Sequence, residues 1–212
     1  MVVLNYALAG YLYELDVPVT ATIPEDASQT SGQFSEMWGD APAEDGTEFL
    51  PWSADGFDLE AILATEPDLI VAGGWGFPGF QAEEAYPDLS AIAPTVLVDR
   101  AFADWRDQAE FLAVDVFGDQ AGFDEMVATY QDRIAEVASS IEVPPQPTSF
   151  ISVTADGKPY VLFEDTGLPR MFDELGFRTN DLVAQHDLAP YQPGGDMAEL
   201  STEQLGQIVD SE

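Results

Sequence analysis

The chain has 212 residues, of which 46% are hydrophobic, so it is long enough to bury one or two packed cores. Forty acidic residues stand against six basic ones, and the formal charge of -34 excludes binding of nucleic acid through its phosphates, which requires lysine and arginine. The absence of cysteine excludes disulfides and thiolate metal sites.

The first half of the chain alternates short apolar segments with segments of helical periodicity. A polar stretch rich in Gly, Ser and Pro at 24–55 is expected to be irregular. No apolar run approaches the roughly 20 residues that span a bilayer. The alternation predicts a parallel sheet with helices on its faces. The expected elements, in chain order, are the strand 2–4, the helix 5–14, the strand 17–23, the helix 58–65, the strand 69–72, the helix 86–92 and the strand 95–98.

The second half begins with two helical stretches and then returns to short strands. The longer stretch carries an apolar stripe at helical spacing and ends at the proline-rich segment 143–147, which breaks any helix. We therefore predict an α/β lobe at 1–120, a bridging helix at 121–143 and a second α/β lobe at 144–212. The expected elements after residue 99 are the helices 104–117 and 121–141, the strands 150–153 and 160–163, and the helix 169–175.

A helical pattern from the first half recurs near the end of the chain. Asp58 and Ser201 are both residues that cap helix N-termini, and each is followed two positions later by a glutamate, Glu60 or Glu203. Ser201 and Gln204 have the spacing of a capping box. The recurrence indicates two similar lobes. Because a buried strand follows the first copy and none follows the second, we expect the second lobe to be incomplete in this sequence.

Four segments in the same order resemble the substrate-binding proteins of iron-siderophore and cobalamin ABC importers. They are 59–71, 86–95, 171–177 and 200–205. Within that family, the segment 144–147 and the Leu-Gly-Phe turn at 175–177 are most similar to the ferric-enterobactin binders. The resemblance implies an α/β fold in which one long helix joins two Rossmann-like lobes, with the second lobe truncated at its C-terminus.

The resemblance also implies a function, which is to capture a ferric, catecholate-type siderophore between the lobes and to deliver it to the permease dimer of an ABC importer. Such a protein is not an enzyme and has no intrinsic cofactor; its ligand is an Fe(III)-siderophore. It works as a monomer in the periplasm or anchored by lipid at the cell surface. Glu60 and Glu203 match the family's two docking glutamates, which meet arginines of the permease. The family's signal sequence is missing, so we expect one upstream, and further strand–helix units after Glu212.

Loops that follow strands supply the candidate ligand-binding residues, because ligands of α/β lobes bind beyond the carboxyl ends of the strands. The implied ligand is aromatic and anionic, so flat rings and arginines are the expected partners. Arg170 also fits a surface ion pair, Trp105 also fits the core, and Trp38 and Trp52 fit core or rim equally. The candidates are Asn5, Tyr6, Trp75, Phe77, Arg100, Trp105, Phe163, Arg170 and Tyr191, with Gln192 beside the last.

Other functions remain to be weighed against this one. The dispersed acidic residues form no calcium-binding loop, and we interpret them as a solvated surface suited to high salt, which screens their repulsion. His186 is the only histidine, which argues against direct capture of zinc or manganese. No motif for a serine or cysteine nucleophile occurs. Two alternatives stay open: cobalamin or haem as the cargo of the same fold, and an acidic glycan hydrolase that uses a pair of carboxylates.

Overall fold

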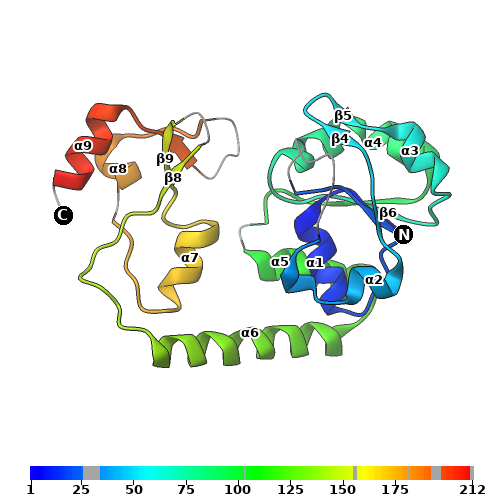
Figure 1. The fold of residues 1–212 in the computed structure, drawn as a ribbon, viewed down its shortest axis with the longest axis horizontal. Helices are drawn as coiled ribbons and strands as arrows, with labels where there is room; N and C mark the ends of the chain where they lie inside the picture. Colours follow the sequence, from blue (N-terminus) through cyan, green and yellow to red (C-terminus); the bar gives the residue numbers. More distant parts are fainter. Residues whose placement is uncertain (26–33, 103, 155–156, 181, 192–196, 211–212) are drawn as a thin grey trace. The chain divides into compact units, whose positions relative to one another are not determined.

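The computed structural model describes residues 1–25, 34–102, 104–154, 157–180, 182–191 and 197–210. The chain divides into two compact units, Met1–Val127 and Ala128–Glu212, and each is described by itself. The division falls within α6 (Gln120–Ser140), the long green helix of Figure 1. Of the helices in the described ranges, none combines the length and the apolar character needed to cross a membrane.

The first unit is built on a five-stranded parallel sheet in the order β3-β2-β1-β6-β7. The central strand β1 pairs with β2 on one side and β6 on the other, with Val2 opposite both Ala21 and Ile70. A parallel sheet with helical crossovers confirms the α/β class expected from the sequence. The strands are β1 (Val2–Val3), β2 (Ala21–Thr22), β3 (Glu48–Phe49), β6 (Ile70–Gly73) and β7 (Thr95–Val98).

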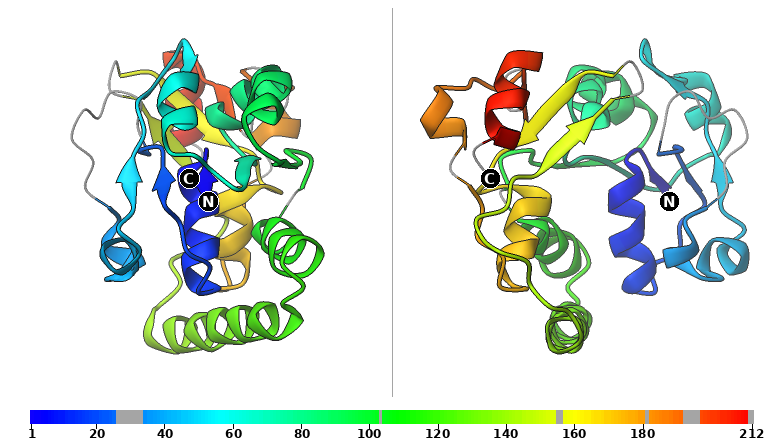
Figure 2. Two further views of the ribbon diagram at one scale, coloured as in Figure 1. Left: turned by 90° about the vertical axis from the view of Figure 1, so that its right-hand side faces the viewer. Right: turned by 60° about the vertical axis from the view of Figure 1, so that its left-hand side comes forward.

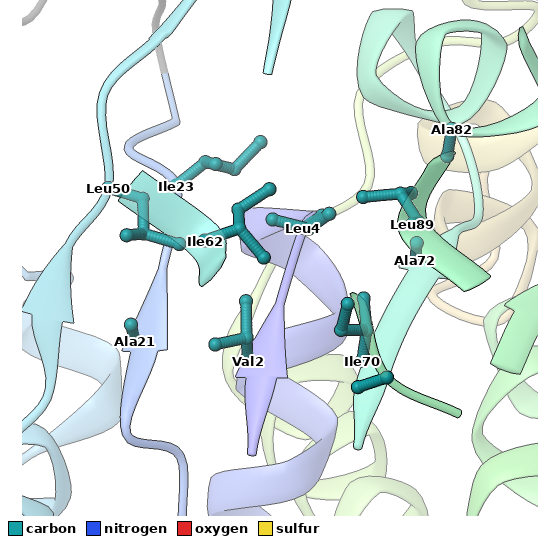
Figure 3. Close-up of a cluster of buried hydrophobic side chains, with 11 residues drawn as sticks. Val2, Leu4, Ala21, Ile23, Leu50, Ile62, Ile70, Ala72, Ala82 and Leu89 are labelled. Atoms are coloured by element: carbon teal, nitrogen blue, oxygen red, sulfur yellow. The ribbon is translucent and has the colours of Figure 1, made fainter. Parts of the chain in front are cut away.

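Side chains that alternate along the strands contribute to two hydrophobic cores, one on each face of this sheet. Successive strand residues point to opposite faces, so Val2 and Ile70 enter one core while Val3 and Val71 enter the other. Figure 3 shows the first core, where side chains from the strands meet Ile62, Ala82 and Leu89 of two helices. The covering elements are α1 (Tyr6–Glu14), η1 (Glu36–Trp38), α2 (Ala41–Asp45), α3 (Leu59–Ala64), α4 (Phe77–Ile92), α5 (Trp105–Glu110) and the π-helix η2 (Phe111–Val116), with the hairpin β4 (Trp52–Ser53) and β5 (Gly56–Phe57).

The described part of the second unit has an antiparallel sheet in the order β10-β9-β8. The right-hand view of Figure 2 shows β8 and β9 as two yellow strands. Only residues 154–158 connect them, which is too short for the crossover that parallel strands need. The small hydrophobic core of the second unit contains Val161, Leu182, Ala198, Leu200 and Ile208. The elements are β8 (Ile151–Val153), β9 (Pro159–Leu162), α7 (Gly167–Asp173), α8 (Leu182–His186), β10 (Met197–Glu199) and α9 (Thr202–Asp210).

Two expected helices differ from the observed ones. The sequence predicts a helix only from residue 86, because four glycines and Pro78 precede it, but α4 starts at Phe77 and includes Pro87. Burial of Gln81, Ala82 and Leu89 outweighs the cost of that internal proline. The expected helix 104–117 is split into α5 and the π-helix η2.

Candidate functional site

The carboxyl ends of β1, β6 and β7 lie at one edge of the parallel sheet, where ligands of α/β lobes bind. Asn5 organises this edge. Its Oδ1 accepts the backbone N–H of Ala7 at 3.0 Å and so caps α1, while its Nδ2 donates to the carbonyls of Gly73 at 2.8 Å and Trp75 at 2.9 Å. The residue is 4% exposed, so its side chain shapes the turn after β6.

Glycines in and after β6 allow the backbone to pack against the rest of the unit. Gly73 has φ +91°, and a Cβ there would lie 2.3 Å from the carbonyl oxygen of Val98. A Cβ on Gly79 would lie 2.0 Å from the carbonyl oxygen of Gly74. The sequence pattern indicates close approach to a bulky ligand, whereas the structure shows close approach of one backbone segment to another.

Two predicted tryptophans follow strands at this edge. The Trp75 Nε1 donates to the carbonyl of Phe102 at 2.6 Å and ties the loop after β6 to the loop after β7. Trp105 begins α5, and its ring lies 6.4 Å from that of Tyr11 and 4.9 Å from the Arg106 guanidinium carbon. Both rings are half-buried. Burial, with the Asp104 charge as a smaller cause, raises the pKa of Tyr11 to about 12.

Phe77 and Tyr6 present rings at the same edge. Phe77 is the first residue of α4 and is 45% exposed. Tyr6, the first residue of α1, packs its ring 4.2 Å from that of Trp38. Burial, with a smaller contribution from Glu25, raises the pKa of Tyr6. The ring of Trp38 is half-buried and also lies 5.0 Å from the Tyr13 ring, so Trp38 belongs to an aromatic cluster. The sequence alone leaves open whether Trp38 is a core or a rim residue.

Arg100 follows β7 and is engaged within the first unit. Its Nε donates to Glu83 Oε1 at 2.8 Å and its Nη2 donates to Glu83 Oε2 at 3.1 Å. The guanidinium carbon also lies 3.7 Å from the centroid of the Phe80 ring. The sequence predicts Arg100 as the partner of an anionic ligand, and it does not reveal that α4 supplies a carboxylate and an aromatic face. No sequence signal points to Glu83, because its contact depends on how α4 packs beside β7.

The second unit carries the remaining candidates. Phe163 is half-buried and packs against the small core, and Arg170 is exposed in the last turn of α7. Tyr191 is 49% exposed, and its ring meets that of Tyr160 edge to face at 5.7 Å. Gln192 lies outside the described residues.

The two predicted docking glutamates have matched local structures. Glu60 is the second residue of α3, where the Asp58 Oδ1 accepts the N–H of Ala61 at 2.9 Å. Glu203 is the second residue of α9, where the Ser201 Oγ accepts the N–H of Gln204 at 3.2 Å. The predicted capping box is confirmed, because the Gln204 Oε1 accepts the N–H of Ser201 at 2.9 Å. Both glutamates are exposed.

Across the described ranges, no three His, Asp or Glu side chains gather into a group that could hold a metal ion.

Comparison with known proteins agrees with this architecture. The chain is 28% identical over 184 residues to the ferric enterobactin-binding periplasmic protein FepB of Escherichia coli O6:H1, covering 85% of this chain and 56% of FepB. It is 26% identical over 121 residues to the probable siderophore-binding lipoprotein YfiY of Bacillus subtilis, covering 57% of this chain and 35% of YfiY. The chain thus spans about half or less of the length of these curated relatives.

Solved structures share the fold. The structure of holo-ViuP matches with a TM-score of 0.78 at 22% identity, over 97% of this chain and 67% of that one. Streptococcus pneumoniae PiaA in complex with ferrichrome matches with a TM-score of 0.72 at 18% identity, over 99% and 70%. The family described as "periplasmic binding protein" matches residues 2–207, which confirms the expectation of a binding protein rather than an enzyme. The chain belongs to the periplasmic binding protein family.

Proposed function

We propose that the chain is the extracytoplasmic substrate-binding component of an ABC importer and that its ligand is a ferric siderophore. The observation that carries this proposal is the similarity to FepB across 85% of the chain. YfiY, a second relative with a siderophore-binding description, supports the same ligand class and an extracytoplasmic location.

We propose that the ligand is held between two lobes, 1–120 and 144–212, connected by a bridging helix at 121–143. The support is that α6 covers most of that helix and ends at Ser140, before Pro144. A helix is a stiffer connection than a pair of strands, so we expect little hinge motion on binding. The protein would act as a monomer, as the resemblance implies.

A catecholate-type siderophore is the ligand that the first unit favours. The half-buried ring of Trp75 lies on the loop after β6, and the half-buried ring of Trp105 and the exposed ring of Phe77 lie at the first residues of α5 and α4. Flat rings of this kind pack well against catechol rings. The name of FepB, which refers to ferric enterobactin, points the same way. Phe163, Arg170 and Tyr191 would complete the contacts from the second unit.

Delivery to the permease would use Glu60 and Glu203. Each glutamate lies in the first turn of a capped helix and is exposed, so it is accessible to a partner. Similar geometry in both units suits a partner that is itself a dimer and presents one arginine to each unit.

Tryptophan fluorescence tests the ligand assignment. Because Trp75 and Trp105 lie at the proposed edge, a ferric tris-catecholate should quench the emission in a saturable way, and an iron-free catecholate should quench it less. Cobalamin and haem serve as competing ligands, and a chain with Trp75→Phe is the matched variant that should lose part of the quenching. Saturable binding of cobalamin or haem, without binding of the ferric catecholate, would replace the siderophore as the cargo. Glycan hydrolysis without binding of any of these three ligands would overturn the proposal.

A further inference from the structure

Arg100 is held by three neighbours on the first two turns of α4. A Cβ placed on Gly79 would lie 2.8 Å from the Arg100 Cδ, so the stem of the arginine passes directly over this glycine. The guanidinium then lies on the Phe80 ring at 3.7 Å and forms two parallel hydrogen bonds with Glu83, at 2.8 and 3.1 Å. Phe80 and Glu83 are three positions apart and are neighbours on the helix surface. The arginine is thus fixed in orientation and paired in charge.

This arrangement occupies the edge of the sheet at which the ligand is expected. Arg100 follows β7, and Gly79 in the first turn of α4 packs against the turn after β6, so both lie near the carboxyl ends of adjacent parallel strands. In a chain with a net charge of -34, an arginine here is a group that can offset the repulsion felt by an anionic ligand. Glu83 cancels that charge.

We propose that Glu83 sets the charge preference of this edge by keeping Arg100 in an intramolecular pair. An anionic ferric siderophore has to displace the Glu83 carboxylate before it can use the guanidinium, whereas an uncharged ferric siderophore does not. Glu83 is a positioning residue, because it acts through Arg100. The inference rests on the proposed siderophore function and adds to it a determinant of which siderophores bind well.

The expected effect is modest, because the pair is partly open to solvent. The Arg100 and Glu83 side chains are 23% and 43% exposed, and exposed pairs of this kind change equilibria by no more than about fivefold. Releasing Arg100 should therefore strengthen binding of an anionic ligand by about two- to fivefold, and should leave binding of an uncharged ligand within about 1.5-fold.

Glu84 provides a matched control on the same helix. Glu83→Gln and Glu84→Gln remove the same charge from adjacent exposed positions of α4, but of the two residues Glu83 is the one hydrogen-bonded to Arg100. Dissociation constants would be measured by tryptophan quenching for a ferric tris-catecholate, which is strongly anionic, and for a ferric tris-hydroxamate, which is uncharged. We expect Glu83→Gln to raise the preference for the anionic ligand by about two- to fivefold over Glu84→Gln.

A double-mutant cycle separates this role from a general change in stability or charge. In an Arg100→Ala background, Glu83→Gln should no longer alter the preference between the two ligands, because the group through which it acts is gone. Equal responses of Glu83→Gln and Glu84→Gln, or a Glu83→Gln effect that persists without Arg100, would overturn the inference while leaving the proposed function intact. Failure of the unmodified chain to bind either ferric ligand would overturn both.

Discussion

Single residues at the carboxyl edge show that a predicted ligand contact can also hold the fold together. Asn5 follows the first strand, as a binding residue would, but its amide joins α1 to the turn after β6. The position of Asn5 could be predicted from the sequence, because it follows an apolar strand and precedes a helical pattern. Its partners could not, because Gly73 and Trp75 are about seventy residues away and meet it only through strand pairing.

Replacing Asn5 by alanine should lower the free energy of unfolding of the first unit by about 2–4 kcal/mol, because a helix cap, one buried hydrogen bond and one partly buried hydrogen bond are lost together. Urea unfolding followed by tryptophan emission measures this. Gln120→Ala removes an exposed amide with one exposed hydrogen bond and should cost no more than about 0.5 kcal/mol. Similar losses for both variants would show that Asn5 does not hold the edge together.

Tyr11 makes the free energy of unfolding of the first unit fall as the pH becomes alkaline. Burial raises its pKa in the folded state to about 12, above the ordinary value of 10.0. Its contribution is complete below pH 10 and is lost as the pH rises towards 12, because the unfolded chain releases the proton first. The raised pKa values of Tyr6 and Tyr13 act in the same direction.

Tyr11→Phe should therefore reduce the fall in unfolding midpoint between about pH 9.5 and 11.5. Tyr86→Phe, at a residue 42% exposed on α4, is the control and should leave the fall unchanged. Denaturant titrations at several alkaline pH values make the comparison. An equal slope in the Tyr11→Phe chain and the unmodified chain would refute the assignment.

At the scale of elements, apolar segments predict the strands β1, β6 and β7, whereas the stretch 24–55, expected to be irregular, contains η1, α2, β3 and β4. The strands around 2–4, 69–72 and 95–98 were identified because their residues are apolar on both faces of a covered sheet. The sequence does not predict the start of α4, because Gly76, Pro78 and Gly79 are typical of a loop, and the helix is fixed instead by contacts of Gly79 and Ala82. Segments such as η1 and α2 lack a strong period of their own.

Two helical glycines allow the packing of α1 to be tested against intrinsic helix propensity. A Cβ on Gly206 in α9 would meet no heavy atom within 4 Å, whereas a Cβ on Gly10 in α1 would lie 3.1 Å from the Trp38 Nε1. Gly206→Ala should stabilise its unit by about 0.5–1 kcal/mol. Gly10→Ala should not give this stabilisation, because the new methyl group displaces Trp38 from its contact with Tyr6 and Tyr13.

Hydrogen exchange in α1 and α9, together with the wavelength of tryptophan emission, distinguishes the two variants. We expect a shift in emission for Gly10→Ala and none for Gly206→Ala. A stabilised α1 with unchanged emission would mean that Trp38 does not rest on Gly10.

At the scale of the whole molecule, the net charge of -34 should make stability depend on salt. Between about 0.1 M and about 1 M KCl the Debye length falls from about 10 Å to about 3 Å, and repulsion between dispersed carboxylates falls with it. The unfolding midpoint should rise by about 5 °C or more near pH 8. At a pH close to the isoelectric point of about 4.1 the gain should shrink. An equal gain at both pH values would count against charge repulsion as the cause.

Delivery to a permease is the function that we propose for the whole molecule, and the matched glutamates Glu60 and Glu203 offer its most direct test. The chain, loaded with a ferric tris-catecholate, would be added to a reconstituted ABC permease of the siderophore class, and uptake of iron would be measured. Glu60→Arg with Glu203→Arg should abolish uptake while ligand binding is retained. Glu14→Arg with Glu110→Arg, which changes the charge equally at two other exposed positions, should leave uptake unchanged. Equal uptake with both double variants would contradict the account.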